Sequence, residues 1–470
     1  MTTIPTNLRK QLDDASQAHV LAFWDDLSDV ERQSLLNQIA STDLKTLNQI
    51  WHSSKSDDSP VDTTARIESA RMPDKVIQQP RTAADTDLWK QATAKGEREL
   101  QEGRVAVITV AGGQGSRLGF EHPKGMFPIG PISQRTLFQI FAEQILARRK
   151  RHVAAIPWLI MTSNATHAET LEFLEQQNYF QLGRDTVHLF QQGSLPALDA
   201  LTGRILMTSR SELALSPDGH GGLVAAIANA GLLELLSRNG IRHLFYHQVD
   251  NPTAILCDPA FVGFHSLQSS QLSTNVVRKL SPTERMGVLA SINGRTEIVE
   301  YSELTPEQSA RCDANGDWIF WAGNTAIHIF DREFVEQLAA DGGKLPLHVA
   351  RKNVPCIDNN GVSIQPDDPT KPNAIKFERF IFDALPIAER TLIVEGHRER
   401  EFNPVKNRDG ADSPETCRAA LSRIGREWLA AAGHPVSDDD AVEISPLQAL
   451  DSQELARKIA AQTIRVSDLF

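Results

Sequence analysis

A glycine-rich segment, Ala111 to Gly130 (AGGQGSRLGFEHPKGMFPIG), carries the residues of this 470-residue chain that are best suited to chemistry. It directly follows Arg104 to Ala111 (RVAVITVA), an apolar run typical of a strand buried on both faces. Glycines permit tight turns and let backbone amides approach an anion closely. Arg117 and Lys124 add positive charge. Because these features occur together, the segment predicts a phosphate-binding loop rather than a plain turn.

Two common phosphate loops do not fit this segment. A Walker A loop ends in Gly-Lys-Ser/Thr, whereas Lys124 follows Pro123. A dinucleotide-binding loop has the pattern G-x-G-x-x-G, but Gly113 and Gly115 are followed by Gly119, one residue too late. The loop is therefore of a third type, and an NAD-dependent oxidoreductase is disfavoured.

The elements around this loop predict an α/β fold. Helix-like and strand-like segments alternate after the loop, which favours layered helices and a largely parallel sheet. Helices are predicted at 135–149, 166–177 and 222–238, and strands at 157–163, 186–191 and 242–250. Strand-like runs then follow one another at 274–280, 287–292, 297–301 and 319–330. Asp250 closes the strand RHLFYHQVD, so its carboxylate is expected at the ligand-binding end of the sheet.

We expect three parts along the chain. Apolar residues at helical spacing predict helices within 7–51, and a second helix is predicted at 87–101. The polar stretch 52–64 reads as a linker. The expected division is an N-terminal helical region at 1–100, a catalytic α/β domain at 101–390 and a small C-terminal domain at 391–470.

Composition limits the partners. The formal net charge is -12, which argues against nucleic acid or an anionic membrane as the main partner. The N-terminus has no apolar signal core, and no apolar stretch approaches membrane-spanning length. The four cysteines form no CxxC pair and none has a His at metal-ligand spacing, which disfavours zinc and suits reduced thiols. We therefore expect a soluble, cytoplasmic protein.

The glycine-rich loop resembles the signature loop of the UDP-sugar pyrophosphorylases, and most closely the eukaryotic-type UDP-N-acetylglucosamine pyrophosphorylases. Further motifs of that family follow in its order between Thr86 and Leu450. They are PWLIMTS at Pro157, FQQGSLPA at Phe190, SPDGHGG at Ser216, VDN at Val249, VEYSEL at Val299, AGNTAIHIF at Ala322, AIKFERFIFD at Ala374 and NPVKN at Asn403. The resemblance implies a Rossmann-like, GT-A-like nucleotide-diphospho-sugar transferase fold.

The resemblance also implies a reaction. UTP and a sugar 1-phosphate, N-acetylglucosamine 1-phosphate in this branch, would give a UDP-sugar and pyrophosphate in the presence of Mg²⁺. The attacking phosphate oxygen is already an anion, so the site must position charged reactants and neutralise charge rather than activate a nucleophile. The protein is expected to act as a monomer.

The site residues follow from the motifs that match. The expected catalytic residues are Arg117, Lys124 and Lys406. UTP would be bound by Val110, Ala111, Gly112, Gly113, Lys124, Gln192, Gly219, Asp250 and Lys376, with Gln192 and Gly219 contacting uracil. The sugar would be bound by His220, Gly287, Glu300, Tyr301, Asn324 and Lys406. Asp250 would be the Mg²⁺ ligand, because this ion prefers oxygen ligands.

Some alternatives stay open. Taken alone, Lys376 and Lys406 are typical surface lysines, and Tyr301 is typical of strand packing. His220 stands where the N-acetylglucosamine branch usually has Asn, and a His there is common in the UDP-glucose and broad UDP-sugar branches. A UDP-glucose or broad-specificity pyrophosphorylase is therefore the alternative. A non-catalytic nucleotide-sugar-binding protein is disfavoured, because it would be expected to lose Arg117, Lys124 or Asp250.

Overall fold

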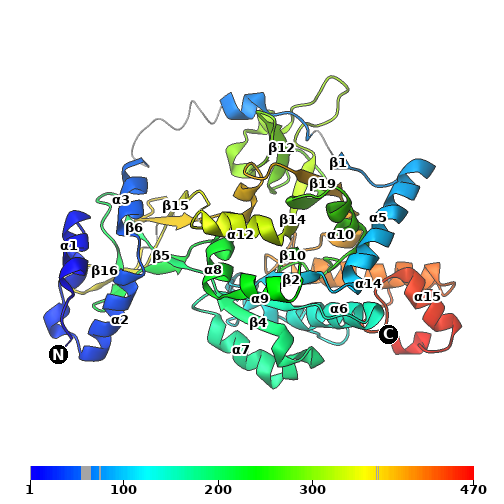
Figure 1. Cartoon of the computed structure of the whole chain (residues 1–470), viewed down its shortest axis with the longest axis horizontal. Coiled ribbons are helices and arrows are strands. Elements are labelled where there is room, and N and C mark those ends of the chain that lie inside the picture. The colour runs from blue at the N-terminus through cyan, green and yellow to red at the C-terminus, as the bar shows by residue number, and fades with distance from the viewer. Residues whose placement is uncertain are drawn as a thin grey trace. The chain divides into compact units, whose positions relative to one another are not determined.

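The computed structural model describes residues 2–53, 65–73, 76–343, 345–366, 368 and 370–469 (Figure 1). The contacts divide the chain into two compact units, each built from separate stretches of sequence. The smaller unit comprises Met1–Ala65, Gln192–Gly222 and Leu345–Ile381. The larger unit comprises Arg66–Gln191, Leu223–Lys344 and Phe382–Phe470.

A mixed sheet forms the centre of the larger unit. Its strand order is β1-β19-β11-β14-β10-β2-β3-β4, and the hairpin of β12 and β13 joins through β14. Along this order, neighbouring strands are parallel except where β14 pairs antiparallel with β10 and β11. The strands of the hairpin are also antiparallel, to each other and to β14. The strands are β1 Val76–Ile77, β2 Val105–Val110, β3 Trp158–Thr162, β4 Val187–Gln191, β10 His243–Gln248, β11 Leu272–Arg278, β12 Val288–Ile292, β13 Arg295–Val299, β14 Ala322–Asp331 and β19 Thr391–Glu395.

Helices bury the apolar strands of this sheet. The main helices are α5 Ala83–Gln101, α6 Leu137–His152, α7 His167–Gln176, α8 Leu223–Asn229, α9 Leu232–Arg238, α10 Pro259–Leu267, α12 Arg332–Ala340, α14 Pro414–Ala431 and α15 Ser452–Ala460. On α6, Phe138 and Phe141 are fully buried in one core cluster with Val107 of β2 and Trp158 of β3. Phe138 and Trp158 meet edge to face, with ring centroids 6.1 Å apart.

Several loops meet at one end of the sheet. Strands β2, β10, β11 and β19 run in one direction and end there, and the antiparallel β14 begins there. The Val249 N–H donates to the Val110 carbonyl at 3.0 Å, just beyond β10 and β2. The Gly396 N–H donates to the Val276 carbonyl at 2.7 Å, beyond β19. This end of the sheet is where open α/β folds place ligands.

The smaller unit packs helices on short antiparallel strands. Its helices are α1 Thr6–Asp14, α2 Asp29–Ala40 and α3 Leu44–Ser53. The strands form the sheet β15-β18-β6 and the pairs β5-β9, β7-β8 and β16-β17. They span β5 Ser194–Pro196, β6 Leu198–Asp199, β7 Met207–Ser209, β8 Glu212–Leu213, β9 Leu215–Pro217, β15 His348–Lys352, β16 Cys356–Ile357, β17 Ser363–Ile364 and β18 Ala374–Glu378. Leu12, Leu35 and Trp51 of the helices share a core cluster with Ile375 and Phe377 of β18.

The α/β fold class expected from the sequence is confirmed, with two differences in detail. The sheet is mixed rather than largely parallel near β14, because that strand returns antiparallel. The helix expected at 222–238 is two helices, α8 and α9, which Gly231 separates with a φ of +67°. Most of the expected linker, 54–64, lies outside the described residues.

The two contact units also cut across the three parts expected along the chain. The helices α1 to α3 and the helix α5 fall in different units, although both lie within 1–100. The expected C-terminal part starts at Thr391, which begins β19, and β19 pairs with β11 inside the large sheet. Residues from 391 onward therefore contribute to the main core from their first strand.

Within the described residues, no single helix has the length and apolar composition needed to cross a membrane. One pair of helices, His220–Asn229 and Leu232–Arg238, reaches that length and apolar composition only when the two are joined, and the pair is bent by 70°. Cys257, Cys312, Cys356 and Cys417 are all free thiols.

Candidate active site

The glycine-rich loop after β2 is held in shape by its own backbone. The Gly115 N–H donates to the His122 carbonyl at 2.9 Å, and the Lys124 N–H donates to the Gly113 carbonyl at 3.1 Å. A Cβ on Gly115 would lie 2.8 Å from Phe120, so this position admits only glycine without rearrangement. A Cβ on Gly113 would meet nothing within 4 Å. The backbone at Gly113 therefore faces open space, as an anion-binding loop requires.

Lys124 and Asp250 come together at the ends of β2 and β10. Lys124 begins a short 3₁₀ helix, Lys124–Met126, and its Nζ donates to the Val405 carbonyl at 3.4 Å. The same Nζ lies 4.0 Å from Asp250 Oδ2, and the two side chains are 15% and 16% exposed. The Val405 N–H donates to the Asp250 carbonyl at 2.7 Å. Three segments far apart in sequence thus hold a cation and a carboxylate in a partly exposed position.

Lys406 adds a second positive charge to this region. Its N–H donates to the Asp412 carbonyl at 2.7 Å, and its Nζ lies 4.0 Å from Asp412 Oδ2 and 5.4 Å from the centre of the Phe402 ring. Burial raises the pKa of the Asp412 carboxyl, while the charge of Lys406 acts in the opposite direction. Sequence reasoning missed Val405 and Asp412, because neither a backbone contact nor an acidic partner in an irregular loop leaves a recognisable pattern.

Arg117 lies on the exposed outer part of the glycine-rich loop, in the 3₁₀ helix Ser116–Leu118. Within the part of the chain that the structure describes, its guanidinium has no ion-pair partner within 4.0 Å. The structure therefore leaves this side chain available to an anion, and its expected catalytic role stays a prediction.

Four of the expected sugar-binding residues lie on β14 or beside it. The Asn324 N–H donates to the Gly287 carbonyl at 2.8 Å. A Cβ on Gly287 would lie 2.9 Å from Glu300 Oε1, so the absent side chain makes room for that carboxylate. Tyr301 follows directly in the 3₁₀ helix Tyr301–Glu303 and is 47% exposed. The hairpin β12-β13 brings these residues to β14 through the pairing of Val288 with Gly323.

The backbone at Asn324 is shaped by a local irregularity. The Asn324 Oδ1 accepts a hydrogen bond from the Ala326 N–H at 3.0 Å, and Ala326 has a φ of +57°. The register between β11 and β14 shifts at Asn275 and Val276, opposite this point. A β-bulge of this kind turns side chains out of the regular alternation, and such bulges are frequent next to active sites.

Four of the expected ligand residues belong to the smaller unit. Gln192 directly follows β4, and Gly219 has a φ of +84°. A Cβ on Gly219 would lie 2.4 Å from the Arg379 carbonyl, so both the φ value and the space require glycine. His220 Nδ1 accepts from the Ile381 N–H at 3.1 Å, and its ring stacks on Phe380 with centroids 5.5 Å apart. The fourth, Lys376, is in β18 and pairs with Ala350 of β15.

A buried carboxylate that sequence reasoning missed organises this loop. Asp218 is 6% exposed, and its Oδ2 lies 3.4 Å from Arg379 Nη1. A Cβ on Gly193 would lie 2.7 Å from Asp218 Oδ2, and one on Gly222 would lie 2.2 Å from Oδ1. Burial raises the pKa of Asp218. Asp218 is the acidic residue of the motif SPDGHGG and directly precedes the expected Gly219 and His220, and this position could have identified it.

Asp250 is suited to hold a magnesium ion whose other ligands would come from the substrate and from water. Asp250 supplies a carboxylate whose nearest cation, Lys124, stays at 4.0 Å. Among the described residues, no three His, Cys, Asp or Glu side chains are grouped as a metal site. Mg²⁺ is often held by one or two carboxylates together with substrate phosphates and water. The site therefore suits an ion bound with a nucleotide rather than a preformed protein cage.

Comparison with known proteins places this geometry in a family. The family model described as UTP–glucose-1-phosphate uridylyltransferase matches residues 60–412. The UDP-N-acetylhexosamine pyrophosphorylase-like protein 1 of Mus musculus is 36% identical over 456 residues, which cover 93% of this chain and 88% of the mouse protein. The UDP-N-acetylglucosamine pyrophosphorylase of Saccharomyces cerevisiae is 34% identical over 458 residues, which cover 94% of each chain.

Solved structures agree. The UDP-N-acetylglucosamine pyrophosphorylase of Trypanosoma brucei has a TM-score of 0.81 at 27% identity, over 98% of this chain and 96% of that one. A putative UDP-N-acetylglucosamine pyrophosphorylase of Entamoeba histolytica has a TM-score of 0.73 at 33% identity, over 81% and 96%. The chain therefore belongs to the UTP–glucose-1-phosphate uridylyltransferase family. It is a UDP-sugar pyrophosphorylase, and hence a nucleotidyltransferase. This confirms the family and the enzyme class expected from the sequence motifs.

Proposed function

We propose that the protein forms UDP-N-acetylglucosamine, or a UDP-N-acetylhexosamine, and pyrophosphate from UTP and the matching sugar 1-phosphate. The observation that carries this proposal is the meeting of Lys124, Asp250 and the Val405–Lys406 backbone at the strand ends of the larger unit. Relatives named for UDP-N-acetylhexosamine and UDP-N-acetylglucosamine support the choice of sugar.

The proposed step is an in-line displacement at the α-phosphorus of UTP. An oxygen of the sugar phosphate forms the new P–O bond, and the bond from the α-phosphorus to the oxygen bridging to the β-phosphorus breaks. Pyrophosphate leaves with the electron pair. Negative charge grows at the leaving group, so fixed cations stabilise the transition state more than the ground state. In the proposal, Lys124, Arg117 and Lys406 supply that charge, and Lys376 adds a phosphate contact.

The proposal assigns the remaining candidates to positioning. Backbone amides of 110–113 would hold the triphosphate, because the open face at Gly113 admits an anion. Gln192 and Gly219 would contact uracil, and Gly287, Glu300, Tyr301 and Asn324 would contact the sugar. Asp250 would hold Mg²⁺ with phosphate oxygens. The ion would neutralise part of the charge that otherwise drives the two anionic reactants apart.

The alternative is a UTP–glucose-1-phosphate or broad-specificity uridylyltransferase, which His220 favours. In the smaller unit its ring contacts Phe380 and accepts from the Ile381 N–H. A cytoplasmic, monomeric enzyme without nucleic-acid or membrane partners completes the proposal, and the four free cysteines suit a reducing compartment.

The direct test is pyrophosphate release from UTP with N-acetylglucosamine, N-acetylgalactosamine and glucose 1-phosphates, each with MgCl₂ and with EDTA. The proposal expects the highest kcat/KM with an N-acetylhexosamine 1-phosphate and no turnover in EDTA. A strong preference for glucose 1-phosphate would replace the proposal with the alternative. Absence of turnover with every sugar would point to a protein that binds nucleotide sugars without catalysis.

A further inference from the structure

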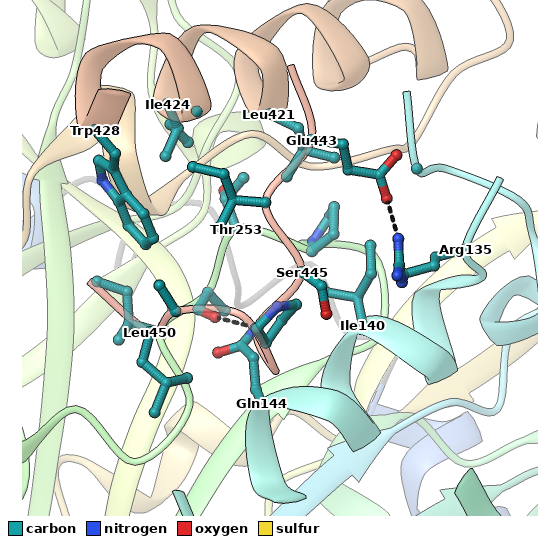
Figure 2. A pocket seen from close by; sticks show the side chains of 18 of the residues that line it. Arg135, Ile140, Gln144, Thr253, Leu421, Ile424, Trp428, Glu443, Ser445 and Leu450 are labelled. Carbon is teal, nitrogen blue, oxygen red and sulfur yellow. Dashed lines mark hydrogen bonds and ion pairs between the residues drawn. The ribbon is translucent and has the colours of Figure 1, made fainter. Parts of the chain in front are cut away.

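A cleft in the larger unit is lined by residues other than those assigned to UTP, sugar or metal binding. Figure 2 shows it between α6 and α14, where the labelled apolar side chains include Ile140, Leu421, Ile424, Trp428 and Leu450. Its cavity volume is about 80 Å³. A water needs roughly 10–15 Å³ on the same kind of measure, so this space admits an apolar ring or chain. None of the expected UTP-, sugar- or metal-binding residues lines it.

This apolar cleft adjoins a wider polar cavity. The two share Arg148, Ile255, Arg400, Trp428 and Leu450 as lining residues. The second cavity has a volume of about 1030 Å³, and its lining includes charged side chains of both signs from α6, α15 and other elements. A molecule at the shared boundary would therefore have an apolar space on one side and a polar one on the other.

Two arginines at that boundary form no ion pair within 4.0 Å among the described residues. Arg148 is 4% exposed, and within the described residues its guanidinium makes a single hydrogen bond, from Nε to the Leu256 carbonyl at 3.2 Å. The Arg400 guanidinium lies over the Trp428 ring, 5.0 Å from its centre. Neither guanidinium has a carboxylate within 4.0 Å. Asp258 also lines the polar cavity, but its two carboxylate oxygens cap α10 by accepting from the Ala260 and Phe261 N–H groups.

Two other arginines that line these cavities do form ion pairs. Arg135, which lines the apolar cleft, pairs with Glu143 at 3.0 Å and Glu443 at 2.8 Å. Arg151, which lines the polar cavity, pairs with Asp451 at 2.9 Å and with Glu454. Burying a cation without a carboxylate at ion-pair distance is costly, because Asp258, and also Glu401 for Arg400, act on these guanidiniums only from farther away. Burial lowers the pKa of both Arg148 and Arg400. An anion at the boundary would remove that cost.

We propose that this region is a second binding site, which takes a small anion carrying an apolar group. The carboxylate or phosphate of the ligand lies between Arg148 and Arg400, where guanidinium groups bind such oxygens in pairs. Its apolar group enters the cleft beside Trp428 and Ile424. The site is separate from UTP and sugar binding, so the proposal does not rest on the proposed function.

The test is a titration of the full-length protein followed by ¹⁹F NMR. The anionic probes are 4-fluorobenzoate and 4-fluorophenyl phosphate, which distinguish a carboxylate from a phosphate ligand, and the neutral probe is 4-fluorobenzyl alcohol. Each titration is repeated with UTP and MgCl₂ present. We expect at least one anion to bind about ten-fold or more tightly than the alcohol, because a charge-assisted hydrogen bond contributes that much. We also expect UTP not to displace it.

Variants locate the binding. Arg400→Met and Arg148→Met should each weaken anion binding about ten-fold or more, and Ile424→Trp should abolish it by filling the cleft. Arg426→Met is the matched control, because Arg426 is on α14 but lines neither cavity and donates to the Asp440 carbonyl. Thermal unfolding of each variant shows which ones are folded. Because Arg400 is less buried than Arg148, its substitution should disturb the fold less. The proposal is overturned if neither anion binds, if UTP displaces it, or if folded Arg400→Met binds as the wild type does.

Discussion

Lys124 and Asp250 are joined through the backbone of Val405. The Lys124 Nζ donates to the Val405 carbonyl at 3.4 Å, while the Val405 N–H donates to the Asp250 carbonyl at 2.7 Å. The two side chains end 4.0 Å apart, beyond hydrogen-bond distance. The expected catalytic cation and the expected metal ligand are therefore positioned by the residue that precedes Lys406. A change in the segment around Val405 should affect both.

Lys124→Ala should reduce turnover without unfolding the protein. We expect kcat to fall by roughly 10² to 10³, or about 3–4 kcal/mol, because a fixed charge is lost where negative charge develops. Lys124 is 15% exposed and outside the apolar core, so the unfolding temperature should change little. Steady-state kinetics and thermal unfolding measure the two effects. Lys90→Ala on α5, at a side chain that is 72% exposed, is the control. Near-full turnover in Lys124→Ala would contradict the role given to Lys124.

Activity should require a divalent ion, and Asp250 should set how much of it is needed. EDTA should abolish turnover and added MgCl₂ should restore it, since the two anionic reactants otherwise repel each other. Asp250→Asn should raise the Mg²⁺ concentration that gives half-maximal rate, because an amide is a weaker ligand than a carboxylate. Asp87→Asn, at a side chain 68% exposed on α5, should leave this concentration unchanged. Full activity in EDTA is the result that excludes this mechanism.

UTP should be preferred over ATP. Gln192 offers a paired donor and acceptor to uracil, and Gly219 cannot carry a side chain because a Cβ would lie 2.4 Å from the Arg379 carbonyl. Gln192→Ala should lower kcat/KM for UTP by about ten-fold, which is the cost of one or two hydrogen bonds left unmade. Rates with both nucleotides, for wild type and variant, provide the measurement. Equal use of ATP and UTP by the wild type would refute the assignment.

Asn324 should discriminate between sugars. Asn324→Asp keeps an oxygen for the Ala326 N–H and so preserves the local backbone, but it removes the amide donor. We expect kcat/KM for N-acetylglucosamine 1-phosphate, relative to glucose 1-phosphate, to fall about ten-fold. Asn324→Ala should show the same change together with a lower unfolding temperature. An unchanged ratio in both variants would place Asn324 outside the sugar pocket.

Substitution of His220 tests the alternative, a preference for glucose 1-phosphate or a broad specificity. If the histidine broadens specificity, His220→Asn should shift the same kcat/KM ratio toward the acetylated sugar. The ring accepts from the Ile381 N–H at 3.1 Å, and an Asn side chain can also accept a hydrogen bond there. His220→Leu has no acceptor and is the control for the loss of this contact. A ratio that moves in His220→Leu but not in His220→Asn would assign the effect to loop structure.

Glu401 should make stability depend on pH. Burial, with the negative charge of Asp258 adding to it, raises the pKa of Glu401 from 4.5 to about 7. Between these values the unfolded chain releases a proton that the folded chain keeps, so the contribution of Glu401 becomes less favourable as pH rises through this window. The unfolding temperature of Glu401→Gln relative to wild type should therefore increase from pH 5.5 to pH 8. Glu399→Gln, at a side chain 71% exposed, should show no such trend. A constant difference would mean that Glu401 titrates normally.

Local patterns in the sequence were enough to predict several elements and the tight loop that follows β2. The run RVAVITVA predicted a buried strand, and β2 is buried over its first five residues, because apolar residues on both faces suit only an interior strand. The glycines after it predicted a tight phosphate loop, and Gly115 is indeed held against Phe120. The ordered motifs identified the family and the enzyme class.

The tertiary structure decided what the local patterns could not. The N-terminal helices pack on β18, and β19 lies inside the main sheet, because long-range packing rather than sequence order sets the units. Val405 and Asp218 are identified by their contacts with distant segments. Arg148 and Arg400 are ordinary arginines in the sequence. Only the fold places them at one cavity boundary without a carboxylate at ion-pair distance, because charge pairing depends on which side chains meet in space.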